Sequence, residues 1–333
     1  MNFRLSYFAF TLLLLLFAAC SKTDTRYQNV SGSVWHTTFN ITYRSSADLR
    51  PQIINAMNEV EQSLSPFLTD SRISLINRNE TDSIDQRIET VFNKSLEINR
   101  ISRGAFDPTV APLINLWGFG YENFRDEPTK IQIDSCLQYV GIADCSIVEG
   151  KIIKKTPETQ FNFSAITKGF GVDQVAATLS EAGCSDYIVE IGGEIAVAGR
   201  NPSGLLWRIQ IDRPDDSRPD EHSRLAVIEV TDCGIAGSGN YRNFRDTSEG
   251  RIGHTISPLT GLPVATSTVG VTVIAPTCME ADALATACMV MPADDAIAMI
   301  ESLPTVSALF VTADGDKLIS IPTSRFPKLI SID

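Results

Sequence analysis

Apolar residues in this chain follow two periodicities, that of a helix and that of a strand, and the two kinds of segment do not alternate regularly. This combination limits the possible folds. Helical spacing runs through residues 53–64, 88–96, 130–140, 164–179, 277–291 and 294–303, and strand-like segments cover 34–43, 161–163, 187–191, 225–230, 269–275, 306–312 and 317–321. Glu149-Gly150 separates two short apolar pairs, as in a β-hairpin. Strands that occur in groups, with helices between the groups, predict an α+β fold rather than a regular βαβ series.

The first twenty residues have the pattern of a targeting signal. Arg4 precedes the apolar run 5–17, which is shorter than the about 20 residues needed to cross a bilayer. Small residues before Cys20 resemble a bacterial lipoprotein signal, and an ordinary cleaved leader is the alternative. This predicts three parts: a signal peptide over residues 1–19, a tether over 20–30 that begins at a lipidated Cys20, and one domain over 31–333. The domain is then expected to be a membrane-anchored lipoprotein facing the periplasm.

Charge and cysteine content exclude two other classes of protein. The net charge of −12 argues against a broad nucleic-acid-binding face. The seven cysteines form no C-x-x-C pair, so a structural zinc site is not expected. Beyond Cys20, disulfides and buried free thiols both remain open.

Residues 276–286 carry the clearest chemical signal. Thr277 followed by Glu280 predicts a capping box, and Asp282 and Thr286 share one face of an otherwise apolar helix. A carboxylate and a hydroxyl so placed suit Mg²⁺, which prefers hard oxygen ligands. The alternative is a solvated aspartate and a threonine bonded to its own helix.

A second segment, 161–171, combines a strand end with a helix start. Ser164 is the predicted N-cap, and Lys168 adds a positive charge to a helix N-terminus that already favours phosphate. It is not a Walker A loop, and a solvated lysine is the alternative. Gly192-Gly193 and residues 234–241 are predicted glycine loops whose N–H groups can cradle an anion.

Two further residues have both a functional and an ordinary interpretation. Asp107 precedes Pro108, so a helix cap is its ordinary role. His254 precedes a turn rich in proline and glycine, and a neutral imidazole there can accept a hydroxyl proton near pH 7. A hydrogen-bonded polar residue without catalytic function is the alternative.

Taken in order, the motifs resemble those of a known family. They comprise residues 70–77, 104–108 with 116–120, 163–169, 190–194, 238–241, 254–263 and 282–286. This series resembles the FAD:protein FMN transferases, the ApbE family, from about Thr37 to the C-terminus. The resemblance implies an α+β fold related to the T-fold, with two lobes and the flavin in the cleft between them.

The resemblance also implies an activity. Such enzymes cleave FAD with Mg²⁺, attach FMN to a threonine of an acceptor protein and release AMP. Some members hydrolyse FAD to FMN and AMP instead, and a flavin-binding carrier without catalysis is a third possibility. No nucleic acid is expected as a partner.

Residue by residue, the resemblance assigns the site. Asp282 and Thr286 match metal ligands, Ala165 matches a ligand acting through its backbone carbonyl, and His254 matches the proposed base. The flavin-site positions are Phe67, Ala105, Phe106, Asp107, Asn162, Lys168 and Ile256. Ala285 stands where some members carry a further aspartate.

Overall fold

The computed structural model describes residues 25–120, 127–214, 223–239, 244–247, 250–253, 255–264, 266–315 and 317–330. Its strands are β1 Arg26–Val34, β2 Thr37–Ser45, β3 Ser146–Val148, β4 Lys151–Ile153, β5 Tyr187–Ile191, β6 Glu194–Ala198, β7 Trp207–Asp212, β8 Arg224–Val230, β9 Cys233–Gly239, β10 Phe244–Thr247, β11 Gly250–Gly253, β12 Thr268–Ala275, β13 Ser307–Asp314 and β14 Lys317–Pro322. Its helices are α2 Arg50–Leu64, α3 Arg72–Asn77, α4 Gln86–Ile101, α5 Ala111–Leu116, α6 Lys130–Leu137, α7 Ser164–Glu181, α8 Cys278–Val290 and α9 Ala293–Ser302, with the 3-10 turns η1 Pro108–Val110 and η2 Ile142–Asp144.

Eight strands form one antiparallel sheet in the order β1-β2-β5-β6-β9-β12-β13-β14. Apolar residues point to both faces of its central strands. In β12, for example, Val271 and Val273 join one core cluster, whereas Ile274 joins another. Because side chains alternate between the faces of a strand, this sheet is buried on both sides along its centre.

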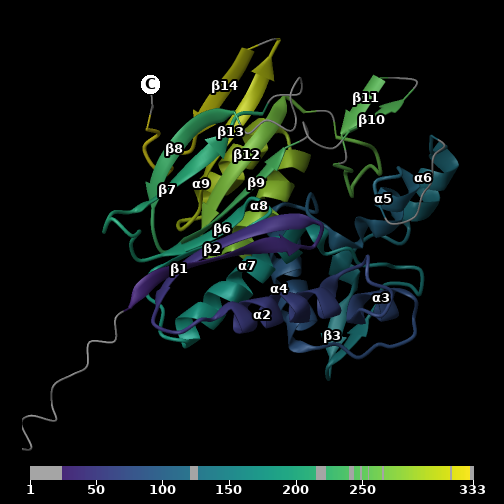
Figure 1. Ribbon diagram of the computed structural model, residues 1–333. Helices are drawn as coiled ribbons and strands as arrows, with labels where there is room; N and C mark the ends of the chain where they lie inside the picture. The colour runs from purple at the N-terminus through teal and green to yellow at the C-terminus, as the bar shows by residue number, and fades with distance from the viewer. Residues whose placement is uncertain are drawn as a thin grey trace, which may run out of the picture.

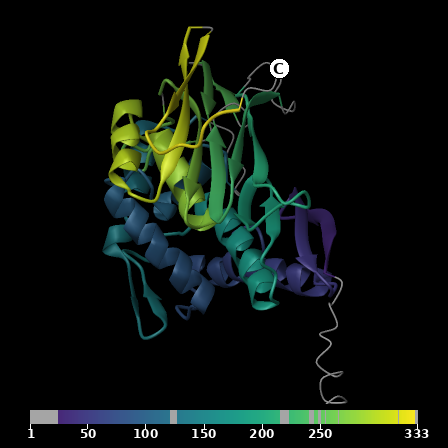
Figure 2. The same cartoon turned by 90° about the vertical axis from the view of Figure 1, so that its left-hand side faces the viewer.

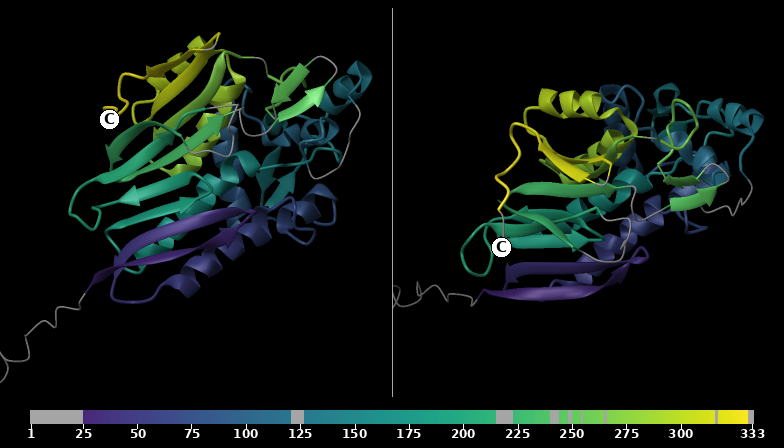
Figure 3. Two further views of the ribbon diagram at one scale, coloured as in Figure 1. Left: turned by 45° about the horizontal axis from the view of Figure 1, so that its top comes forward. Right: turned by 90° about the horizontal axis from the view of Figure 1, so that it is seen from above.

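Different elements cover the two faces (Figures 1 and 2). Helices α7 and α8 pack directly on the strands, with α2 and α4 against them. The β7–β8 hairpin covers part of the opposite face through Trp207, Ile209 and Ile228. Figure 3 shows this layering from above, with the β10–β11 hairpin and helices α5 and α6 beyond the same end of the sheet. The prediction of an α+β fold is confirmed.

The N-terminal part of the sheet differs from the prediction. A single strand was predicted over residues 34–43, but β1 and β2 form a hairpin whose turn is Trp35-His36, with φ of 49° and 59°. Strand β1 begins at Arg26, so residues 26–30 belong to the sheet rather than to the predicted tether. Left-handed turn residues are usually glycine or asparagine, which is why this turn left no signal in the sequence.

Two internal predictions were also wrong. Residues 161–163 are not a strand, because the side chain of Asn77 accepts from the Phe161 N–H and donates to its carbonyl, both at 2.8 Å. The glycine loop predicted over 234–241 is instead strand β9 as far as Gly239. At Gly234 a Cβ atom would collide with the backbone of Cys278, so glycine here lets the start of α8 lie directly on β9. Among the described residues, no helix is long and apolar enough to cross a membrane.

Candidate functional site

A cavity of about 1190 Å³ opens where β5, β6, β9 and β12 meet the helices α7 and α8. Residues of the segment 105–119 and of the loop 255–258 form its other wall, so it lies between two parts of the fold. Ten of the predicted site residues line it: Phe67, Ala105, Phe106, Asp107, Asn162, Ala165, Lys168, Ile256, Asp282 and Thr286. His254 lies outside the described residues, and its neighbour Thr255 lines the cavity.

The cavity floor depends on a close contact between α7 and α8. Asp282 is only 4% exposed, and its Oδ2 accepts a hydrogen bond of 2.9 Å from the Gly169 N–H. In a regular α-helix that N–H would donate to the carbonyl of Ala165. The bond to Asp282 thus ties the two helices together beside the carbonyl that was predicted to bind metal.

The N-terminus of α8 is capped by a residue from α7. Asp173 accepts from the N–H groups of Cys278 and Met279 at 2.9 and 2.8 Å, and Thr277 accepts from Glu280 N–H at 3.2 Å. Burial raises the pKa of Asp173 to about 6, although the two backbone donors oppose this shift. Three orphan helix donors are therefore satisfied, and α8 is fixed against α7.

Three charged groups meet at the wall of the cavity. Lys168 Nζ lies 2.6 Å from Oε1 of Glu194, the first residue of β6. Burial raises the pKa of Glu194 and of Asp282, and the Lys168 ammonium opposes both shifts. Burial also opposes the charge of Lys168, but Glu194 and Asp282 outweigh it and raise the pKa of its ammonium. Lys168 therefore stays charged at neutral pH.

The donors at this wall suit a hard divalent cation. Asp282 supplies a carboxylate and Thr286 a hydroxyl from one face of α8, and Ala165 lies opposite on α7. Within the described parts of the chain, no group of three or more His, Cys, Asp or Glu side chains could hold a metal ion. An ion here would complete its shell with a backbone carbonyl, water and substrate oxygens, which is the coordination that Mg²⁺ prefers.

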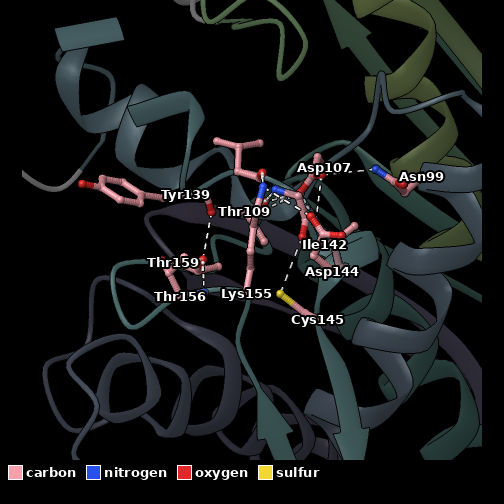
Figure 4. A network of polar contacts seen from close by, with 12 residues as sticks. Asn99, Asp107, Thr109, Tyr139, Ile142, Asp144, Cys145, Lys155, Thr156 and Thr159 are labelled. Carbon is pink, nitrogen blue, oxygen red and sulfur yellow. Dashed lines mark hydrogen bonds and ion pairs between the residues drawn. The ribbon is translucent and has the colours of Figure 1, made fainter. Parts of the chain in front are cut away.

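Asp107 has the ordinary role that its sequence suggested, and it also lines the cavity. Its Oδ1 accepts from the N–H and hydroxyl of Thr109 at 2.9 and 2.5 Å, and its Oδ2 accepts from Ile142 N–H at 3.0 Å (Figure 4). Burial raises its pKa, and these hydrogen bonds and Lys155 oppose the shift. Asp107 therefore caps η1 and connects it to η2.

The remaining predicted residues shape the entrance. Ser164, the predicted N-cap, is instead the first residue of α7, and Phe163 holds the N-cap position without a side-chain cap bond. Asn162 Oδ1 accepts from the Ser164 N–H at 2.9 Å. Phe67 is 59% exposed at the rim. Ile256 is buried against Val110 and Leu113, which anchors the loop that follows His254.

Comparison with known proteins places the chain in a family. A model of the ApbE family matches residues 35–310. The chain belongs to the ApbE family. A protein named FAD:protein FMN transferase from Vibrio cholerae is 36% identical over 328 residues, covering 96% of this chain and 97% of that protein. One of the same name from Haemophilus influenzae is 33% identical over 331 residues, covering 95% and 94%.

Solved structures agree with this assignment to the ApbE family. The flavin transferase ApbE from Vibrio cholerae matches with a TM-score of 0.80 at 34% identity, covering 90% of this chain and 98% of that one. The apo form of Pseudomonas stutzeri flavinyl transferase ApbE matches with a TM-score of 0.80 at 28% identity, covering 90% and 95%. The α+β fold implied by the ApbE resemblance is confirmed.

The sequence did not predict two carboxylates that shape this site: Glu194, which lines the cavity, and Asp173, which caps α8. Glu194 lies within the motif 190–194, but its position in the sequence does not show that its side chain reaches Lys168 on α7. Asp173 has helical spacing to Gly169, and only the packing of α7 on α8 makes it a cap. Two sequence features could have pointed to them: an acidic residue directly after Gly192-Gly193, and a lone aspartate on an otherwise apolar helix.

Gly169→Ala tests the contact between α7 and α8. We expect the free energy of unfolding to fall by about 1–3 kcal/mol, the usual cost of overpacking. A Cβ at this position would overlap the carbonyl of Cys278 and lie 2.8 Å from the Cβ of Asp282. This outweighs the about 1 kcal/mol that alanine gains over glycine in a helix.

Chemical denaturation of both proteins measures the difference. Gly237→Ala is the control, because its nearest neighbour would be the Val271 oxygen at 3.7 Å. A Gly169→Ala protein as stable as the wild type would show that α7 and α8 can separate without cost.

Proposed function

We propose that this protein is an FAD:protein FMN transferase that cleaves FAD at its diphosphate, attaches FMN to a threonine of an acceptor protein and releases AMP. The observation that carries the proposal is the convergence of the predicted site residues, from segments far apart in the sequence, on one cavity. The names of relatives that match almost the whole chain support it. The proposed metal site comprises Asp282, Thr286 and the carbonyl of Ala165.

The proposed reaction exchanges the phosphoanhydride bond of the FAD diphosphate for a phosphoester bond to threonine. The threonine hydroxyl oxygen attacks the phosphorus of the FMN half, and the bond from that phosphorus to the bridging oxygen breaks. The bridging oxygen leaves with AMP and keeps the bonding electrons, while His254 accepts the threonine proton. Phosphoryl transfer of this kind needs positioning and charge neutralisation more than a protein nucleophile.

The residues that line the cavity suit both requirements, charge neutralisation and positioning of the substrate. Lys168 and the N-terminus of α7, at Ser164 and Ala165, face the cavity and favour an anionic group. Mg²⁺ at Asp282 would supply further neutralisation of the diphosphate charge. Phe67 and Phe106 give the cavity aromatic surface for the flavin ring.

One incubation tests the proposal. The purified protein is mixed with FAD, Mg²⁺ and a peptide carrying a candidate acceptor threonine, and the products are weighed. We expect the peptide to gain the mass of FMN less water, with one AMP released per transfer, and a chelator to stop the reaction. Free FMN and AMP with an unmodified peptide would indicate an FAD pyrophosphatase. FAD left intact with every divalent metal would indicate a carrier.

The membrane anchor is a separate proposal that rests on the first twenty residues. We expect Cys20→Ser to release the protein from the membrane fraction or to leave its signal peptide uncleaved, because the lipid is attached to that thiol. Cell fractionation and the mass of the N-terminal peptide measure this. Cys136→Ser, which leaves the lipidation site intact, is the control. A soluble wild-type protein with an unmodified N-terminus beyond residue 20 would contradict the proposal.

A further inference from the structure

Lys168 and Glu194 form an ion pair that the proposed reaction does not by itself require. The Glu194 side chain is 2% exposed, and its Oε2 is buried without a hydrogen-bond partner among the described residues. The Lys168 side chain is 39% exposed, and both residues line the cavity. The carboxylate is thus buried behind an ammonium group that faces the substrate space.

Stability alone does not explain this arrangement. Burying a carboxylate costs several kcal/mol, and the attraction of one ammonium often fails to repay it. Here the carboxylate is also close to a second one, Asp282, which raises the pKa of Glu194 further. A buried ion pair of this kind, at the wall of the cavity, points to a role in geometry rather than in stability.

The backbone around Glu194 is held by the pairing of β5 with β6 and by the turn before it. It follows the turn Gly192-Gly193, whose φ angles are 63° and 99°, and the Gly193 N–H donates to Glu190 at 2.8 Å. A Cβ on Gly192 would lie 2.9 Å from a methyl group of Thr37. Lys168 by contrast ends a flexible four-carbon stem. The rigid partner is therefore Glu194, and the mobile one is Lys168.

We propose that Glu194 is a positioning residue that holds the Lys168 ammonium at the cavity wall. The other N–H donors of Lys168 can then donate to the diphosphate of FAD. An ammonium has three donors, and Glu194 Oε1 takes one of them. Holding the charge in place before the substrate arrives removes the need to order it during the reaction. The assignment rests on the proposed function for its substrate, and its first test does not depend on turnover.

The first test measures how Lys168 reacts with an amine-directed acylating reagent at pH 8, by peptide mass. Glu194→Gln removes the negative charge and keeps the shape of the side chain. We expect it to speed the acylation of Lys168 about tenfold, because an opposite charge this close shifts a pKa by about one unit or more. FAD should protect Lys168 in the wild type, and riboflavin, which lacks the diphosphate, should not.

The second test compares Glu194→Gln, Lys168→Met and the double variant in FAD cleavage. We expect Glu194→Gln to lower kcat about 10–100-fold, as outer-shell partners typically do, with the KM for FAD within about threefold of wild type. Two effects on FAD binding oppose each other: loss of the carboxylate charge favours the anionic substrate, and loss of the fixed Lys168 orientation disfavours it. In the Lys168→Met background the same change should lower kcat less than about threefold.

Glu229→Gln is the matched control, because Glu229 pairs with Arg208 at 3.7 Å on the exposed face of the β7–β8 hairpin and does not line the cavity. Equal acylation rates of Lys168 in wild type and Glu194→Gln would overturn the inference, and so would protection by riboflavin as strong as that by FAD. Equal kcat losses with and without Lys168 would also overturn it. If the wild type cleaves no FAD, the proposed function fails, while the acylation experiment still decides the role of Glu194.

Discussion

Asp282→Ala is expected to lower metal-dependent FAD cleavage by about a hundredfold or more, because a bound metal supplies several kcal/mol of charge stabilisation. Asp282 is the one carboxylate in the proposed metal site, and Ala285 offers no second one on the same turn of α8. The fold should persist, since α7 is a continuous helix over Ser164–Glu181 and a costly buried carboxylate is removed.

The measurement is FAD turnover at a series of sub-millimolar Mg²⁺ concentrations, with thermal unfolding to check the fold. Glu280→Gln is the control, because it removes a carboxylate from the same helix at a position that does not line the cavity. Normal turnover by Asp282→Ala at low Mg²⁺ would show that the metal assignment is wrong.

His254→Ala should separate transfer from binding. A threonine hydroxyl is a poor nucleophile until a base takes its proton, and a positioned base contributes about 10²–10⁴-fold. FMN transfer to the acceptor should fall by that factor, while FAD affinity should stay near that of wild type. Residual hydrolysis can continue, because a bound metal lowers the pKa of its water.

Two measurements on the His254→Ala variant test this prediction. Flavin fluorescence gives the affinity for FAD, and the mass of the acceptor gives the amount of attached FMN. His36→Asn is the control, because His36 lies in the β1–β2 turn with φ of 59°, which asparagine tolerates. Unchanged transfer would remove His254 from the mechanism. Joint loss of transfer and binding would make it a flavin-contacting or structural residue.

Local patterns in the sequence predicted most helices and several strands. The spacing of apolar residues placed α2 and α8 within a few residues of their observed ends, and Glu149-Gly150 marked the β3–β4 hairpin. These features depend on neighbours within a few positions, so the sequence contains their whole cause. The same local logic put Asp282 and Thr286 on one face of α8.

Several strands were not predicted, among them β1, β6, β7 and β9, and for β1 and β9 the physical cause lies elsewhere in the chain. Strand β9 looks like a glycine loop until α8 is placed on it, because its Gly234 is needed only for that contact. Strand β1 looks like part of a tether until β2 pairs with it through a turn that has no glycine.

The sequence by itself determined the α+β class, the oxygen pair on α8 and, through the order of its motifs, the family. Only the tertiary structure decided which charges meet. Lys168 and Glu194 are 26 positions apart, and Gly169 and Asp282 are 113 apart. Asp173 caps a helix that begins 105 residues later. Contacts over such separations depend on how α7, α8 and the β5–β6 turn pack together, and no periodicity in the chain records that packing.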